Sequence, residues 1–130
     1  MASARRLKNA LFNGVIELPG NPLDRSHKAA LDSLLVAIPG VEAGEMTGLP
    51  AYFVGKKMFA CIWNGGVGVR LSASEAANLQ FSKGNVVPFQ PKGRPSTREW
   101  IQINHENSAD YEKDLQIFQA SITFVRSAKT

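Results

Sequence analysis

The spacing of apolar residues along the chain predicts three helices separated by groups of strands. The first predicted helix covers Asp24–Ile38, where apolar residues recur every three or four positions. Its apolar stripe consists of Leu31, Leu34, Leu35 and Ile38. Asp24 or Ser26 can cap the start of this helix, and Pro39–Gly40 is expected to end it.

After this helix the pattern changes to the short apolar runs that are typical of strands. We predict strands over Glu42–Thr47, Ala51–Val54, Lys57–Trp63 and Val67–Leu71. Asn64–Gly66 is a strong turn signal, because asparagine and glycine tolerate positive φ. In the last of these strands the apolar residues face one way, while Gly68 and Arg70 face the other. The four strands should form an antiparallel meander.

The second half of the chain returns to helices. Ser72 is expected to open a helix that runs to about Phe81, with Glu75 completing a capping box. Two further strands are predicted over Val86–Phe89 and Glu99–Ile103. The last helix, about Ser108–Arg126, has the longest apolar stripe, which we expect to be buried against the sheet. That stripe consists of Tyr111, Leu115, Phe118, Ile122 and Val125.

The predicted order of elements is a helix, a β-meander, a helix, two strands and a helix. This order is typical of an α+β fold, in which an antiparallel sheet of about five to six strands is flanked by helices. We expect residues 1–23 to form an N-terminal arm, mobile or loosely docked, and residues 24–130 to form a single domain. A chain of 130 residues can bury a sizeable core without disulfides or a structural metal.

The single cysteine, Cys61, excludes an internal disulfide and favours a reducing, cytoplasmic location. No stretch has the roughly 20 apolar residues that a membrane span needs, so we expect no membrane association. The basic start of the chain does not fit a secretory signal, because Asn9, Asn13 and Glu17 interrupt its short apolar run.

No catalytic constellation is apparent among the residue types that usually supply one. Neither His27 nor His105 lies in a motif with a nucleophile, and we expect both histidines to be exposed to solvent. Cys61 lies in the most hydrophobic strand and should be buried and inert. One cysteine and two distant histidines do not make a metal site, and no motif indicates a cofactor. We therefore expect no enzymatic activity, no metal and no cofactor.

The chain is mildly basic, with a formal net charge of +4. The best candidate for a functional loop is the proline-rich stretch from Pro88 to Arg98. Its cations Lys92, Arg94 and Arg98, together with Arg70 in the predicted strand Val67–Leu71, are candidate contacts for an anion or nucleic acid. An ordinary surface loop that happens to be basic is the alternative explanation for these cations. The aromatic residues near the strand ends, Trp63 and Trp100 among them, could stack on bases or simply form core.

Several short motifs resemble those of the YjbR/MmcQ-like proteins and the related TfoX N-terminal domain. These are Ile38–Glu42 (IPGVE), Gly48–Ala60 (GLPAYFVGKKMFA) and Gly68–Leu71 (GVRL). Pro88–Phe89 with Gly93–Pro95 resembles the TfoX version, whereas the opening at Ile38 is closer to the YjbR version. The chain departs from the family pattern at Lys56, where a glycine is expected, and at Arg70, where a lysine is usual.

The resemblance implies a sheet flanked by helices, similar to secretion-chaperone-like domains, in a bacterial protein without catalytic residues. It also implies DNA binding, by fold analogy for the YjbR-like proteins, or a role in regulating bacterial competence genes, for the TfoX type. We therefore expect a non-enzymatic regulatory or interaction domain with an unknown protein partner. Two alternatives stay open: a ligand-binding protein or enzyme built on residues such as Arg70, Trp100 and His105, and a weak, sequence-independent nucleic-acid binder.

Overall fold

The structure, a computed structural model, describes residues 22–91 and 97–128. A six-stranded sheet has the order β2-β3-β4-β5-β7-β6, and each neighbouring pair is antiparallel. The strands are β2 (Val41–Met46), β3 (Leu49–Val54), β4 (Lys57–Trp63), β5 (Gly66–Arg70), β6 (Val86–Pro88) and β7 (Trp100–Asn104). The helices are α1 (Leu23–Leu35), α2 (Ala73–Ser82), the 3₁₀ helix η2 (Ser108–Asp114) and α3 (Leu115–Ser127). The predicted α+β class and antiparallel sheet are confirmed.

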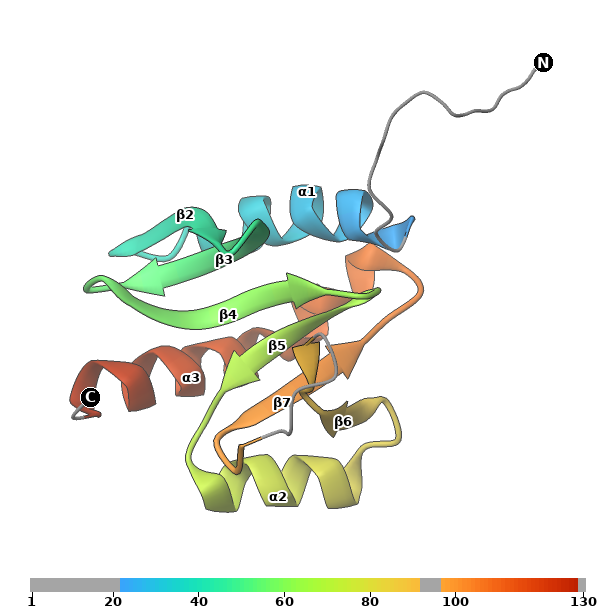
Figure 1. Ribbon diagram of the computed structural model, residues 1–130, viewed down its shortest axis with the longest axis vertical. Helices are drawn as coiled ribbons and strands as arrows, with labels where there is room; N and C mark the ends of the chain where they lie inside the picture. The colour runs from blue at the N-terminus through green and yellow to red at the C-terminus, as the bar shows by residue number, and fades with distance from the viewer. Residues whose placement is uncertain (1–21, 92–96, 129–130) are drawn as a thin grey trace.

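The helices all contribute to one core on one face of the sheet. Figure 1 shows α1 along the β2–β3 end of the sheet and α2 beyond the β6–β7 end, with α3 between them. Across the strands, Tyr52 pairs with Ala60, Ala60 with Val69 and Val69 with Ile101, and all four side chains are buried in this core. The helices pack against this row with Leu31, Leu35, Ala76, Phe118, Ile122 and Val125. The opposite side of the sheet, which we call the open face, lacks such a layer among the described residues.

A β-bulge in β4 decides which side chains reach the open face. Ala60 pairs with Tyr52, but Phe53 pairs with Met58, so Phe59 has no cross-strand partner of its own. Phe59 and Ala60 are consecutive, yet both are buried in the main core. Met58 packs instead with the residues of the open face. The bulge therefore breaks the regular alternation of faces along this strand.

The predicted side-chain cap of the first helix is wrong. The helix begins at Leu23 after Pro22, and no side chain caps it. Asp24 instead accepts a hydrogen bond of 2.7 Å from the backbone N–H of Gly65, and the hydroxyl of Ser26 donates to the carbonyl of Leu23. The predicted serine cap of α2 is confirmed, since Ser72 accepts from the backbone N–H of Glu75 at 3.3 Å. The predicted capping box is incomplete, because Oε1 of Glu75 accepts from the hydroxyl of Ser72 at 3.2 Å and not from its backbone N–H.

The last predicted helix is two elements rather than one. The first seven residues form η2, which turns with three residues instead of 3.6, and this shifts the face that later residues present. Tyr111, Phe118 and Ile122 are buried as predicted, but Leu115 is only half-buried. The other predicted boundaries lie within three residues of those observed. Residues 1–21 of the predicted arm lie outside the described residues, and Leu23 already belongs to α1. None of the helices in the described ranges is long and apolar enough to span a membrane.

Candidate functional site

The open face has a small apolar centre of its own. Ala51 pairs with Cys61, Cys61 with Gly68 and Gly68 with Gln102, which makes a row across four strands. Ala51, Cys61 and Phe89 are buried there. The half-buried side chains around them are Leu49, Phe53, Met58, Trp63 and Trp100. Apolar surface on this face therefore stays partly in contact with solvent.

Two glycines of β5 let other side chains lie directly on its backbone. A Cβ atom at Gly68 would stand 2.6 Å from Cε1 of Phe89, so the ring of Phe89 occupies that space. A Cβ atom at Gly66 would meet the side-chain oxygen of Asn104 and would lie 3.0 Å from Nε2 of Gln102. Glycine at these two positions is what allows Phe89 and the two amides to cross the strand.

Gln102 and Asn104 form a fixed pair of amides on this face. Nε2 of Gln102 donates to the carbonyl oxygen of Trp63 at 3.3 Å and to Oδ1 of Asn104 at 2.8 Å. Because a carbonyl can only accept, the first bond fixes the orientation of the Gln102 amide, and the second then fixes that of Asn104. The pair is thus set in one arrangement by its own hydrogen bonds.

Each amide keeps one polar atom unused. Within the described ranges, Oε1 of Gln102 and Nδ2 of Asn104 make no hydrogen bond. Among the described residues, only Nδ1 of His27 and the hydroxyl of Tyr111 are side-chain polar atoms that are both buried and unpaired. The two unused amide atoms are therefore reached by solvent. One is an acceptor and the other is a donor.

These amides line a hollow of about 500 Å³ that is open to solvent, which we call the amide hollow. Its walls include Trp63, Val87, Gln102, Asn104, His105 and Glu106. No lysine or arginine is among the described residues that line it. A second hollow of about 280 Å³ is apolar, with Leu49, Met58, Cys61 and Phe89 in its wall. The volume of the amide hollow lies within the usual range for small-molecule sites, about 300–1,000 Å³.

Both histidines are more enclosed than predicted, so the expectation of exposed histidines is wrong. His27 is fully buried, and its Nε2 lies 3.1 Å from the carbonyl oxygen of Gly65. The side chain of His105 is 15% exposed, and its Nε2 lies 2.6 Å from Oδ2 of Asp114. The two imidazole rings meet Tyr111 edge to face, with ring centres at 5.0 and 4.8 Å. Burial, followed by the nearby Asp114 and Asp24 carboxylates, raises the pKa of Tyr111 well above its ordinary value.

Neither histidine is hydrogen-bonded to a serine, threonine, cysteine or lysine side chain in the described part of the chain. Cys61 is buried as predicted, and burial raises the pKa of its thiol to about 11. No group of three or more histidine, cysteine, aspartate or glutamate side chains suited to a metal occurs among the described residues.

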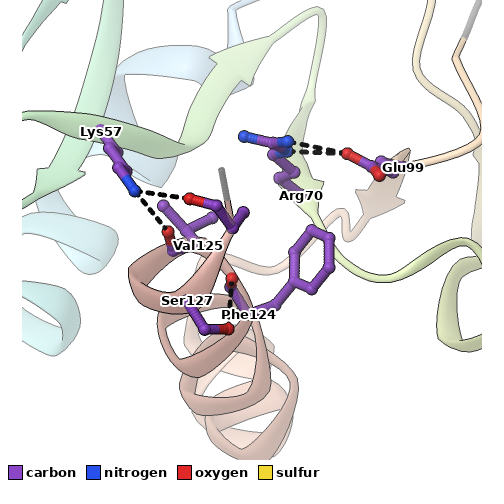
Figure 2. Close-up of polar contacts among 7 residues, drawn as sticks. Lys57, Arg70, Glu99, Phe124, Val125 and Ser127 are labelled. Carbon is purple, nitrogen blue, oxygen red and sulfur yellow. Dashed lines mark hydrogen bonds and ion pairs between the residues drawn. The ribbon is translucent and has the colours of Figure 1, made fainter. Parts of the chain in front are cut away.

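The residues predicted to contact an anion lie in different settings. Nε and Nη2 of Arg70 both donate to Oε1 of Glu99, at 3.0 and 2.8 Å, and the guanidinium lies 5.5 Å from the ring centre of Phe124 (Figure 2). Arg98 is exposed. Lys92 and Arg94 lie outside the described residues. Anion or nucleic-acid contact by these four residues stays a prediction.

Figure 2 also shows how the C-terminal end of α3 is held near Arg70. Nζ of Lys57 donates to the carbonyl oxygen of Ala128 at 2.7 Å and to that of Val125 at 3.4 Å. A cation at this end of a helix satisfies carbonyls that have no partner within the helix. Lys57 and Arg70 therefore both contact α3 or its end and help to hold this helix on the sheet.

Arg70, Trp100 and His105 do not come together in one site. Arg70 pairs with Trp100 across β5 and β7. His105 follows five residues later, roughly 16 Å along an extended chain. Only His105 lines the amide hollow.

Sequence reasoning missed Gln102 and Asn104 as site residues. Their positions on alternate residues of β7 carried a usable signal, because such residues share a face. The sequence does not indicate that β5 pairs with β7, and this strand pairing places Asn104 opposite Gly66 and Gln102 opposite Gly68.

A search of protein-family models finds no family that matches the chain, and no curated protein matches it.

Proposed function

We propose that this chain is a non-enzymatic binding domain that recognises its ligand or partner on the open face of the sheet. The observation that carries the proposal is the pair of solvent-reached amide atoms, Oε1 of Gln102 and Nδ2 of Asn104, in the hollow beside Trp63. A concave surface with an aromatic wall and a few fixed polar groups is the usual form of a binding site.

The fixed amides support binding because they are ordered before a ligand arrives. A side chain that must be immobilised on binding costs about 0.5–1.5 kcal/mol in lost freedom. The hydrogen bonds of Gln102 to Trp63 and Asn104 remove most of that cost in advance. A regulatory role of the kind that the YjbR/TfoX resemblance implies would use such a site to sense a ligand or a partner. We place this role in the cytoplasm, where the single buried thiol of Cys61 would stay reduced.

Weak nucleic-acid binding is the second candidate, and exposed Arg98, one of the four predicted contact residues, favours it. This candidate predicts binding that is steeply weakened by salt and indifferent to base sequence. The open-face proposal instead predicts binding that depends little on salt.

The test is a two-dimensional ¹H–¹⁵N NMR survey of the labelled protein with a set of several hundred small, polar aromatic compounds. Compounds that bind should shift resonances of β4, β5 and β7 residues on the open face, and no compound should be chemically converted. Hits confined to the helix side, for example the groove between α2 and α3 at Asn78 and Gln116, would contradict the proposal. Turnover of a hit would favour the enzyme alternative.

A further inference from the structure

We infer that the amide hollow binds a planar, uncharged heterocycle that presents a hydrogen-bond donor beside an acceptor, as nucleobases do. This inference rests on the proposed function, since it assigns a ligand class to the same face. It uses three features of the hollow: the unused amide atoms, the aromatic wall and the absence of cationic side chains among the described lining residues.

The unused atoms are of the two kinds that the edge of a base pairs with, one acceptor and one donor. Asparagine and glutamine recognise bases by offering one acceptor and one donor to a donor and acceptor that lie side by side. Here two amides, joined by the 2.8 Å bond from Nε2 of Gln102 to Oδ1 of Asn104, share the task. Gln102 supplies the acceptor Oε1, and Asn104 supplies the donor Nδ2.

The walls of the hollow suit a flat ring. The half-buried side chain of Trp63 belongs to the apolar centre of the open face and also lines the hollow. Val87 and Pro88 of β6 add further apolar lining. Stacking of a base on an aromatic side chain contributes about 1–3 kcal/mol and does not depend on which base is bound. A heterocycle can therefore satisfy the apolar and the polar parts of the wall together.

The carboxylate of Glu106 in the described lining favours a ligand without a phosphate group. This carboxylate is exposed, and the described lining of the hollow includes no lysine or arginine. A phosphate group would approach this carboxylate without a described cation in the wall to bind it. We therefore assign a free base or nucleoside as the ligand, in preference to a nucleotide or a nucleic-acid strand.

The experiment compares 1-methyluracil with 1,3-dimethyluracil by NMR titration of the full chain. The two probes have the same ring, but the second has a methyl group in place of the N–H donor. We expect 1-methyluracil to shift the amide-hollow resonances and 1,3-dimethyluracil to bind at least tenfold more weakly. Uridine should bind at least as tightly as uridine 5′-phosphate or a single-stranded oligouridylate.

The matched variant is Asn104→Asp, which keeps an oxygen to accept from Gln102 and removes the donor Nδ2. Its affinity for 1-methyluracil should fall at least tenfold. The same change at Asn78, an exposed residue of α2 at the groove with α3 and outside the amide hollow, should leave the affinity unchanged. The comparison of the two probes on the unaltered protein does not depend on whether the variant folds.

Equal binding of the two methylated probes would overturn the inference, and so would unchanged affinity in a folded Asn104→Asp variant. Absence of binding by any base or nucleoside would also overturn it. Tighter, salt-sensitive binding of the oligouridylate would assign the site to nucleic acid instead. If the inference fails while other compounds still shift the open face, the proposed function stands with another ligand class.

Discussion

Replacing Gly68 by alanine tests whether Phe89 packs directly on the backbone of β5. The added Cβ would lie 2.6 Å from Cε1 of the Phe89 ring and 2.8 Å from Cδ1 and Cζ, so the ring must move by roughly 1 Å to reach ordinary contact distance. Phe89 is 8% exposed and is one of three buried residues at the centre of the open face. Overpacking of this kind typically costs about 1–3 kcal/mol. We expect Gly68→Ala to lower the free energy of unfolding by about 2 kcal/mol in urea titrations.

A double-mutant cycle with Phe89→Ala separates this clash from other effects of alanine. All three nearest atoms to the built Cβ belong to Phe89, so Gly68→Ala should cost less than about 0.5 kcal/mol once the ring is absent. Gly84→Ala is the control, because its Cβ would meet no atom within 4 Å. An equal cost of Gly68→Ala with and without the ring would refute the packing of Phe89 on β5.

Three further predictions concern the stability and reactivity of the core. Cys61 should react with thiol reagents at neutral pH only after denaturant is added, because burial raises the pKa of its thiol to about 11; rapid labelling of the native protein would contradict its placement. Phe118→Ala should lower the free energy of unfolding by about 3–5 kcal/mol in urea titrations, since the ring is fully buried. Tyr52→Phe should lower it by about 1 kcal/mol at pH 7, through loss of the 2.6 Å bond to Asp32. Burial raises the pKa of Asp32, but hydrogen bonds from Lys28 and Tyr52 lower it further than burial raises it. The stabilisation by the ionised Asp32 is therefore present above its unfolded pKa of about 3.9 and is lost as the pH falls through the lower folded value, so the effect of Tyr52→Phe should shrink in acid melts.

Local patterns were sufficient to predict most element boundaries and the meander. In β5 the alternation of valine with glycine and arginine assigns two faces. The structure confirms this for Val67, Val69 and Gly68, whereas the guanidinium of Arg70 reaches the ring of Phe124 on α3. The same reasoning fails for β4, because Phe59 and Ala60 are both apolar and nothing local indicates that they share a face. The bulge is set by the pairing with Tyr52 and Phe53 on β3.

The helical period of α1 could have placed His27 correctly. His27 lies four residues before Leu31 and eight before Leu35, so the three side chains share one face of the helix, and all three are buried. The amide hollow could not be predicted from a local pattern, since it depends on the pairing of β5 with β7.

The two tryptophan indole N–H groups provide the most direct test of binding at the amide hollow. Trp63 lines the hollow, whereas Trp100 packs on Phe89 with ring centres 5.5 Å apart, towards the other end of β7. In a titration of ¹⁵N-labelled protein with 1-methyluracil, the account predicts that the indole resonance of Trp63 moves in a saturable manner while that of Trp100 stays in place. Movement of Trp100 alone, or of neither resonance up to the solubility limit of the probe, would contradict it.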